Sequence, residues 1–146
     1  ERKCEFGEGD CLGNKLLSCA SDMSKDDSSI MAFTTCLMSS STLLKDGTEA
    51  RILAKAKMCA SRHSYSWLDL RDCAVNVEGE QLLKQAGHRQ KEIDSTMDHV
   101  PAVYYNEEFV WSMSSNISQL PKQLCKHLMD IPAGRALCRR MRFMNV

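Results

Sequence analysis

Cysteine is the residue type that most constrains this chain. The 146 residues contain an even number of cysteines: Cys4, Cys11, Cys19, Cys36, Cys59, Cys73, Cys125 and Cys138. Their spacings include no Cys-x-x-Cys pair of the kind that builds structural zinc sites. We therefore expect all eight to form disulfides within the chain. Cys125–Cys138 is the local pair that we predict, and the other pairings stay open. Disulfides persist in oxidising compartments, so the expected location is outside the cell or in an endosomal or lysosomal lumen.

Length and charge exclude several classes of protein. A chain of 146 residues has the size of one domain. Lys plus Arg and Asp plus Glu both number 19, so no overall field would attract a polyanion, and a dedicated nucleic-acid binder is not expected. No stretch is apolar for the roughly 18 residues that a membrane span needs. The first residue is Glu1 and not Met, so we expect a processed or trimmed form whose targeting segment lies outside these residues.

Apolar residues recur at helical spacing from about residue 14 to about residue 90. The first 13 residues lack this periodicity and are predicted to be a loop held by its two cysteines. Thr48 and Ser66 are expected to precede helices, and Gly87 is expected to end the last of them. This part of the chain is therefore predicted to be a set of helices tied together by disulfides.

A different pattern covers about residues 97–130. Two β-prone segments flank Asn106-Glu107-Glu108, which predicts a hairpin with a tight turn. A closing helix follows, in which Pro121 is tolerated only in the first turn. Residues 135–146 are predicted to be a basic, solvated tail. Together these segments predict a single helix-rich α+β domain over residues 1–146.

The segment from Cys4 to Cys19 resembles the signature of the gamma-interferon-inducible lysosomal thiol reductase family, C-Q-H-G-x-x-E-C-x-x-N-x-x-x-x-C. The positions that match in place are Cys4, Gly7, Cys11, Asn14 and Cys19. Asp10 stands at the acidic position, whereas Glu5 and Phe6 replace the family's Gln and His. The resemblance extends to about Cys125 through Asp72-Cys73-Ala74 and Val100-Pro101-Ala102-Val103. It points to divergent insect members of the family, the mosquito one among them.

The resemblance implies a thioredoxin-like fold with a disulfide-tied helical insertion, here partial or atypical. It also implies disulfide reduction by a C-x-x-C dithiol on a strand-to-helix turn, and these 146 residues contain no C-x-x-C. Six residues separate Cys4 from Cys11, and among them are Glu5, Glu8 and Asp10, carboxylates that would raise a thiol pKa. We therefore predict that this pair is structural, and we assign no catalytic residue and no cofactor.

Candidate binding residues follow from the same resemblance. Pro101 resembles the cis-proline of thioredoxin-like folds, which makes His99, Val100 and Pro101 a candidate binding surface; the other interpretation of Pro101 is an ordinary strand-leading proline. The sequon at Asn116 predicts glycosylation. The four histidines share no ligand-like spacing, so no metal site is expected.

Three classes of function remain open. The first is a non-catalytic member of the family that binds an unidentified protein, with a second copy of the chain as a further candidate partner. The second is an active reductase whose C-x-x-C segment lies outside these residues. The third is a binder of sulfated glycans or anionic membrane surfaces through the basic tail. The arginines of that tail are Arg135, Arg139, Arg140 and Arg142.

Overall fold

The computed structural model describes residues 4, 7–24, 26–39, 47–95, 102–106, 108–112 and 117–143, with only the backbone described for 111, 112, 117 and 141–143. Contacts within the chain cluster in two compact units, Glu1–Gln90 and Lys91–Val146. The sequence prediction treats both as one domain. Each unit is described by itself below.

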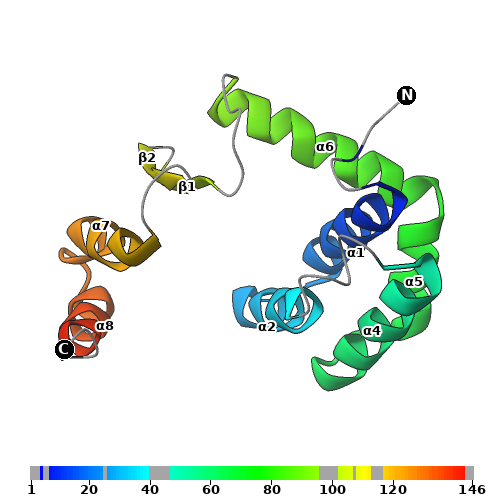
Figure 1. Ribbon diagram of the computed structural model, residues 1–146, viewed down its shortest axis with the longest axis horizontal. Coiled ribbons are helices and arrows are strands. Elements are labelled where there is room, and N and C mark those ends of the chain that lie inside the picture. The colour runs from blue at the N-terminus through cyan, green and yellow to red at the C-terminus, as the bar shows by residue number, and fades with distance from the viewer. Residues whose placement is uncertain are drawn as a thin grey trace. The chain divides into compact units, whose positions relative to one another are not determined.

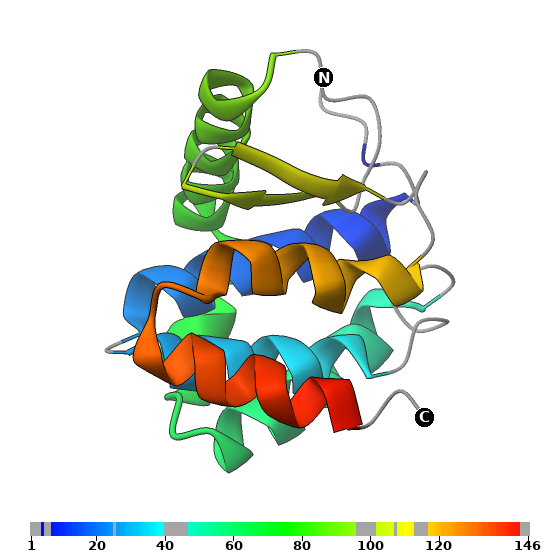
Figure 2. The same ribbon diagram turned by 90° about the vertical axis from the view of Figure 1, so that its left-hand side faces the viewer.

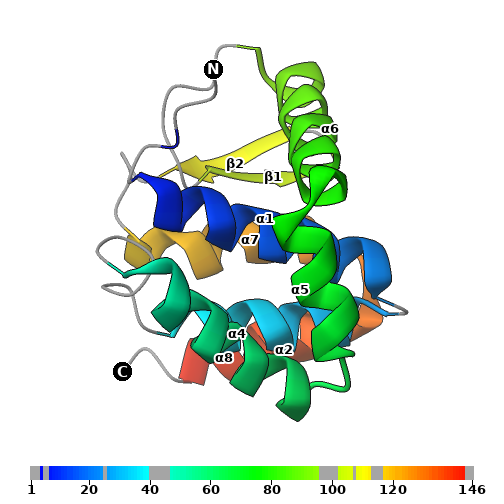
Figure 3. The same cartoon turned by 90° about the vertical axis from the view of Figure 1, so that its right-hand side faces the viewer.

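The described part of the first unit is built from helices (Figure 1). They are α1 (Glu8–Met23), α2 (Asp27–Met38), α4 (Glu49–Arg62), α5 (Trp67–Val75) and α6 (Val77–Ile93), of which α6 runs on past the end of the unit. Helix α1 packs against α5 and α4, and α4 packs against α2 and α5. Figure 3 shows α1 alongside α5, and the chain passing almost directly from α5 into α6.

The core of this unit is apolar and cross-linked. Leu16, Phe33, Ile52 and Leu70 have no exposed surface and come from four different helices. Two disulfides join the helices that meet there: Cys19–Cys73 links α1 to α5, and Cys36–Cys59 links α2 to α4. Burial of these side chains supplies the main favourable term in folding, and the disulfides restrict the unfolded chain.

The second unit contains a hairpin and two helices, with a short 3-10 turn between them. The strands are β1 (Ala102–Tyr105) and β2 (Glu108–Ser112), followed by η1 (Ile117–Gln119), α7 (Leu120–Leu128) and α8 (Pro132–Phe143). The strands are antiparallel, and an irregularity after Val103 leaves Val110 as an extra residue in β2. Figure 2 shows α7 and α8 running in opposite directions, and Cys125–Cys138 joins them.

Several local predictions are confirmed. Thr48 and Ser66 occupy the N-cap positions of α4 and α5, although neither side chain makes a capping hydrogen bond. The hairpin forms with Asn106 in its turn at φ 50°, and Pro121 lies in the first turn of α7. The helix-rich α+β class is confirmed too. The thioredoxin-like arrangement stays a prediction, since the sheet in the described ranges is this one hairpin.

Three boundaries differ from the prediction. Helix α1 begins at Glu8, because Glu8 and Asp10 stabilise the positive end of a helix even without apolar periodicity. Helix α6 continues through Gly87 to Ile93, and Gly87 does not take the positive φ of a helix-ending glycine. Residues 135–143, expected to be tail, belong to α8. None of the helices in the described ranges is both long enough and apolar enough to cross a membrane.

Candidate functional site

The signature residues meet at the start of α1. Gly7 precedes the helix with φ +89°, a conformation that residues with a Cβ rarely adopt. Its N–H donates to the Cys4 carbonyl (3.3 Å), and its carbonyl accepts from the Cys11 N–H (3.2 Å). The Cys4–Cys11 disulfide then closes the loop, with the two Cα atoms 5.5 Å apart. Cys4 is thereby held against the first turn of the helix.

The remaining signature residues also have structural partners. Asn14 Nδ2 donates to Asp10 Oδ1 (3.1 Å) one turn earlier in α1. Cys19 is fully buried and bonded to Cys73 of α5. The signature therefore shapes a helix start and fixes the helix to its neighbour, which explains why these residue types occur at these spacings.

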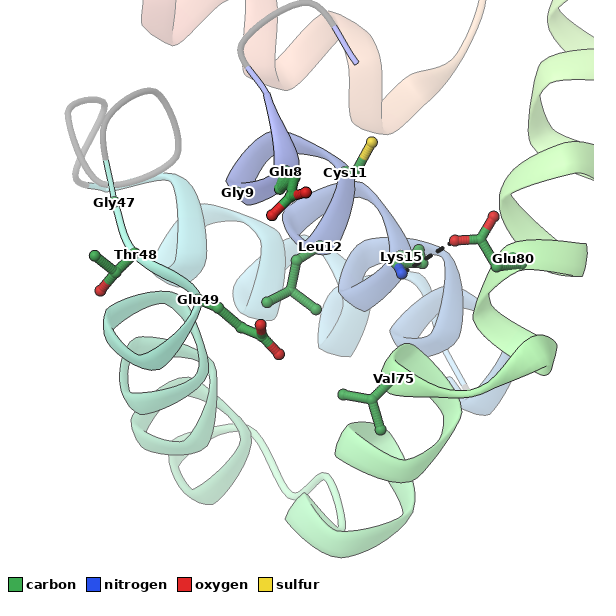
Figure 4. Close-up of a pocket in the computed structure, with 10 residues that line it drawn as sticks. All are labelled: Glu8, Gly9, Cys11, Leu12, Lys15, Gly47, Thr48, Glu49, Val75 and Glu80. Atoms are coloured by element: carbon green, nitrogen blue, oxygen red, sulfur yellow. Dashed lines mark ion pairs between the residues drawn. The ribbon is translucent and has the colours of Figure 1, made fainter. Parts of the chain in front are cut away.

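A groove of about 720 Å³ lies beside this helix start (Figure 4). It is lined by the first two turns of α1, the residues that lead into α4, the end of α5 and Glu80 of α6. Leu12, Glu49 and Val75 point into it, and Lys15 and Glu80 point toward each other. The Lys15 Nζ atom is 3.1 Å from Glu80 Oε1, so an ion pair joins α1 to α6 across the wall of the groove.

The described lining of this groove includes no free thiol. Thiol–disulfide exchange starts with a thiolate, and all eight cysteines are in disulfides. Figure 4 shows the Cys11 sulfur directed away from Leu12. Glu8 and Glu49 contribute carboxylates to the lining, but within the described ranges no three His, Cys, Asp or Glu side chains are grouped as a metal ion would require. The groove can offer charge and hydrogen bonds to a bound group.

The sequence model of the family described as gamma interferon inducible lysosomal thiol reductase (GILT) matches residues 1–63. The gamma-interferon-inducible lysosomal thiol reductase-like protein of Anopheles gambiae is 31% identical over 141 residues, which cover 88% of this chain and 56% of that protein. The chain belongs to the GILT family. GILT-like protein 1 of Drosophila melanogaster is 28% identical over 116 residues, 73% of this chain and 44% of that protein.

The resemblance found in the signature is thus confirmed. The chain spans about half the length of the curated relatives it matches. No solved structure matches it. The fold of this chain is therefore argued from its own geometry.

The other predicted binding and glycosylation residues belong to the second unit. His99, Val100, Pro101 and Asn116 lie outside the described residues. Arg135, Arg139 and Arg140 are exposed on α8, where Arg135 Nη1 donates to the Met129 carbonyl (3.1 Å). Arg142 also belongs to α8, but its side chain is outside the described part. Positions 135 and 139 are four residues apart and share one face of the helix.

Sequence reasoning missed the lining of the groove. Lys15 and Glu80 are distant in sequence and meet only because Cys19–Cys73 and the packing of α1 on α5 bring their helices together. No motif marks either residue. The one signal in the sequence is indirect: Lys15 lies one turn after Cys11, on the same face of α1.

Proposed function

We propose that this chain is a non-catalytic member of the GILT family that acts by binding another protein in an oxidising compartment, either outside the cell or in an endosomal or lysosomal lumen. The observation that carries the proposal is the state of the cysteines. All eight are paired within the chain, and the 146 residues contain no C-x-x-C. The cysteines that the family signature supplies hold the scaffold together.

The exchange reaction explains why this observation matters. An attacking thiolate forms a mixed disulfide, which a second nearby thiol must resolve. Cys4 and Cys11 are the nearest pair of cysteines in the sequence, with a separation of seven residues. Cys4 precedes α1 and Cys11 lies within it, so the two do not share one helical turn as the cysteines of a C-x-x-C pair do. This separation favours a structural bond.

A second candidate function is disulfide reduction by a longer form of the protein. The curated relatives extend well beyond the matched region, and a C-x-x-C encoded outside these 146 residues would supply the missing dithiol. In that case the described residues would form the part of the enzyme that carries no thiol. Intact mass of the natural protein, read against its complete coding sequence, separates this candidate from the first.

A third candidate is glycan or anionic-surface binding through α8. It is supported by Arg135 and Arg139, which share one face of that helix. Retention on heparin that decreases with salt, and that is lost on truncation after Cys138, would favour it. Retention unchanged by the truncation would reject it.

The main proposal is tested by a disulfide-reduction assay on the 146-residue chain at acidic and neutral pH, with a C-x-x-C-containing reductase as positive control. We expect no turnover above the uncatalysed rate, because no cysteine is free. The paired variants C4A/C11A and C125A/C138A serve as matched controls. Turnover by the natural sequence that C4A/C11A abolishes and C125A/C138A retains would overturn the proposal.

A further inference from the structure

Helices α2 and α4 form a second groove, distinct from the one at the start of α1. The helices pack side by side, and the Cys36–Cys59 disulfide fixes them. Lys55 Nζ of α4 donates to Ser39 Oγ at the end of α2 (2.9 Å), which places the two helices in antiparallel register. The groove has a volume of about 540 Å³ and is shallow and open along its length.

The described residues that line this groove carry charge of one sign. They include Lys55, Arg62 and His63, from α4 and the residue after it, and no carboxylate. Within the part of the chain that the structure describes, no ion pair joins Lys55 or Arg62 to a carboxylate. The two permanent cations are therefore available to a ligand.

The floor of the groove is apolar. Met31, Ala32 and Thr35 of α2 line it, and apolar atoms make up most of its exposed lining. Met31 is 63% exposed. An exposed methionine provides an adaptable contact surface, because its unbranched thioether side chain can adjust to different partners.

We infer that the α2–α4 groove docks an amphipathic segment of a partner protein, one that places carboxylates beside apolar side chains. The carboxylates would pair with Lys55 and Arg62, and the apolar side chains would cover Met31. The inference rests on the proposed protein-binding function and adds to it the surface and the chemistry of the partner. Charge complementarity favours this occupant, because the cations of the groove lie beside its apolar lining and match carboxylates that lie beside apolar side chains.

Other occupants match the groove less well. A small ligand needs a cavity that encloses most of its surface, and this groove is open. A sulfated glycan has no apolar face for Met31 and Ala32. A membrane surface is flat on the scale of this groove. Its headgroups would contact the cations but would not fill the groove between the helices.

The test is a selection from a random peptide library displayed on phage, with the natural 146-residue chain as bait. Two charge-reversal variants are compared for binding of the selected peptides: K55E/R62E changes the groove, and R51E/K57E makes the same change of charge on α4 at exposed positions that do not line it. A second pair separates apolar contact from charge, with M31D in the groove and L68D at an equally exposed apolar residue outside it. Circular dichroism confirms that each variant keeps the natural helix content.

We expect the selected peptides to be enriched in Asp and Glu beside Leu, Ile, Phe or Met. Their affinity should fall about tenfold in K55E/R62E and change less than about twofold in R51E/K57E. M31D should weaken binding and L68D should not. Binding should also weaken as salt is raised.

The inference is overturned by enrichment of basic or uncharged peptides, by no enrichment, or by equal losses in the two charge-reversal variants. Binding to phosphatidylserine vesicles or heparin that only K55E/R62E abolishes would assign the groove to that ligand instead, and dimerisation that only K55E/R62E prevents would assign it to a second copy. Each of these outcomes removes the groove assignment, whereas the non-catalytic role is tested separately by the disulfide-reduction assay.

Discussion

Gly79 allows α6 to follow α5 closely because it has no Cβ. A Cβ at this position would lie 2.7 Å from the Cys73 carbonyl oxygen and 3.0 Å from the Ala74 Cα, both of them backbone atoms. Because neither atom can move without shifting α5, we predict that Gly79→Ala lowers the free energy of unfolding by about 1–3 kcal/mol. Urea unfolding followed by circular dichroism measures this loss.

Gly87 provides the matched control within the same helix. Nothing lies within 4 Å of a Cβ built there, so Gly87→Ala should raise the free energy of unfolding by up to about 1 kcal/mol through helix propensity. Equal effects of the two substitutions would show that the close approach at Gly79 does not limit stability.

Asp26 links the stability of α2 to pH. Its carboxylate accepts from the Ser29 hydroxyl (2.8 Å) and from the Ser29 N–H (2.9 Å), and these bonds lower the pKa of Asp26 below its ordinary value of 3.8. A depressed folded pKa means that the stabilisation is fully present above pH 3.8 and is lost as pH falls through the folded pKa. We predict that Asp26→Ala lowers the melting temperature at pH 7 and that this difference from the natural chain shrinks between pH 4 and pH 2.

The control for Asp26 is Asp26→Asn. An asparagine can cap the helix without titrating, so its effect on the melting temperature should be small at neutral pH. A loss in Asp26→Ala of the same size at pH 2 and at pH 7 would contradict the assignment of this pH dependence to the cap.

The helix starts were predictable at the residue scale where the information is local. Thr48 and Ser66 could be placed because a Thr or Ser directly before an apolar repeat marks a helix start by itself. Lys15 and Glu80 could not be paired, since their contact depends on how α1, α5 and α6 pack. The close approach of Gly79 to the Cys73 and Ala74 backbone could not be predicted either, since it depends on how α6 leaves α5.

At the scale of elements, the disulfides differ in the length of chain they close. Cys19–Cys73 spans 54 residues and joins α1 to α5, whereas Cys4–Cys11 spans only seven. Loop entropy assigns about 4 kcal/mol to the first and about 2 kcal/mol to the second. Cys19 and Cys73 are also buried, so their replacement leaves a cavity as well.

We therefore predict that C19A/C73A lowers the free energy of unfolding more than C4A/C11A does. Urea titrations of the two variants and the natural chain, under non-reducing conditions, give the order. Cys36–Cys59, with a separation of 23, should fall between them. A larger loss in C4A/C11A would show that the turn before α1 matters more to folding than the covalent link between α1 and α5.

The errors at element ends share one physical cause. Sequence periodicity marks helices through their buried faces, and the misplaced parts have few buried residues. In α6 only Gly79 is buried, so the turns from Gly87 to Ile93 show no apolar repeat that would extend the prediction. In helix α8 likewise, only Gly134 and Cys138 are buried among the side chains that the structure describes. The disulfides were predictable as a set because cysteine count and spacing are properties of sequence alone.

At the scale of the whole molecule, the described apolar core belongs almost entirely to the first unit. Its members range from Leu12 to Ala74. Among the residues of Lys91–Val146 whose side chains are described, only Gly134 and Cys138 are buried. Since apolar burial provides most of the stability of a domain, the two units should differ in their resistance to urea, with the second unit held largely by Cys125–Cys138.

The two tryptophans make this difference measurable in the complete chain. Trp67 packs against the core of the first unit, and Trp111 lies in β2 of the second, opposite Val103. The single-tryptophan variants W111F and W67F therefore report the two units separately by fluorescence. We predict that the signal of Trp111 changes at a lower urea concentration, and over a broader range, than the signal of Trp67. The urea unfolding of each variant is also followed by its helicity, so that any loss of stability caused by the Phe substitution is measured and corrected for. Coincident transitions would mean that the chain unfolds as the single cooperative domain that its length alone predicts, because two-state unfolding requires all probes to report the same midpoint.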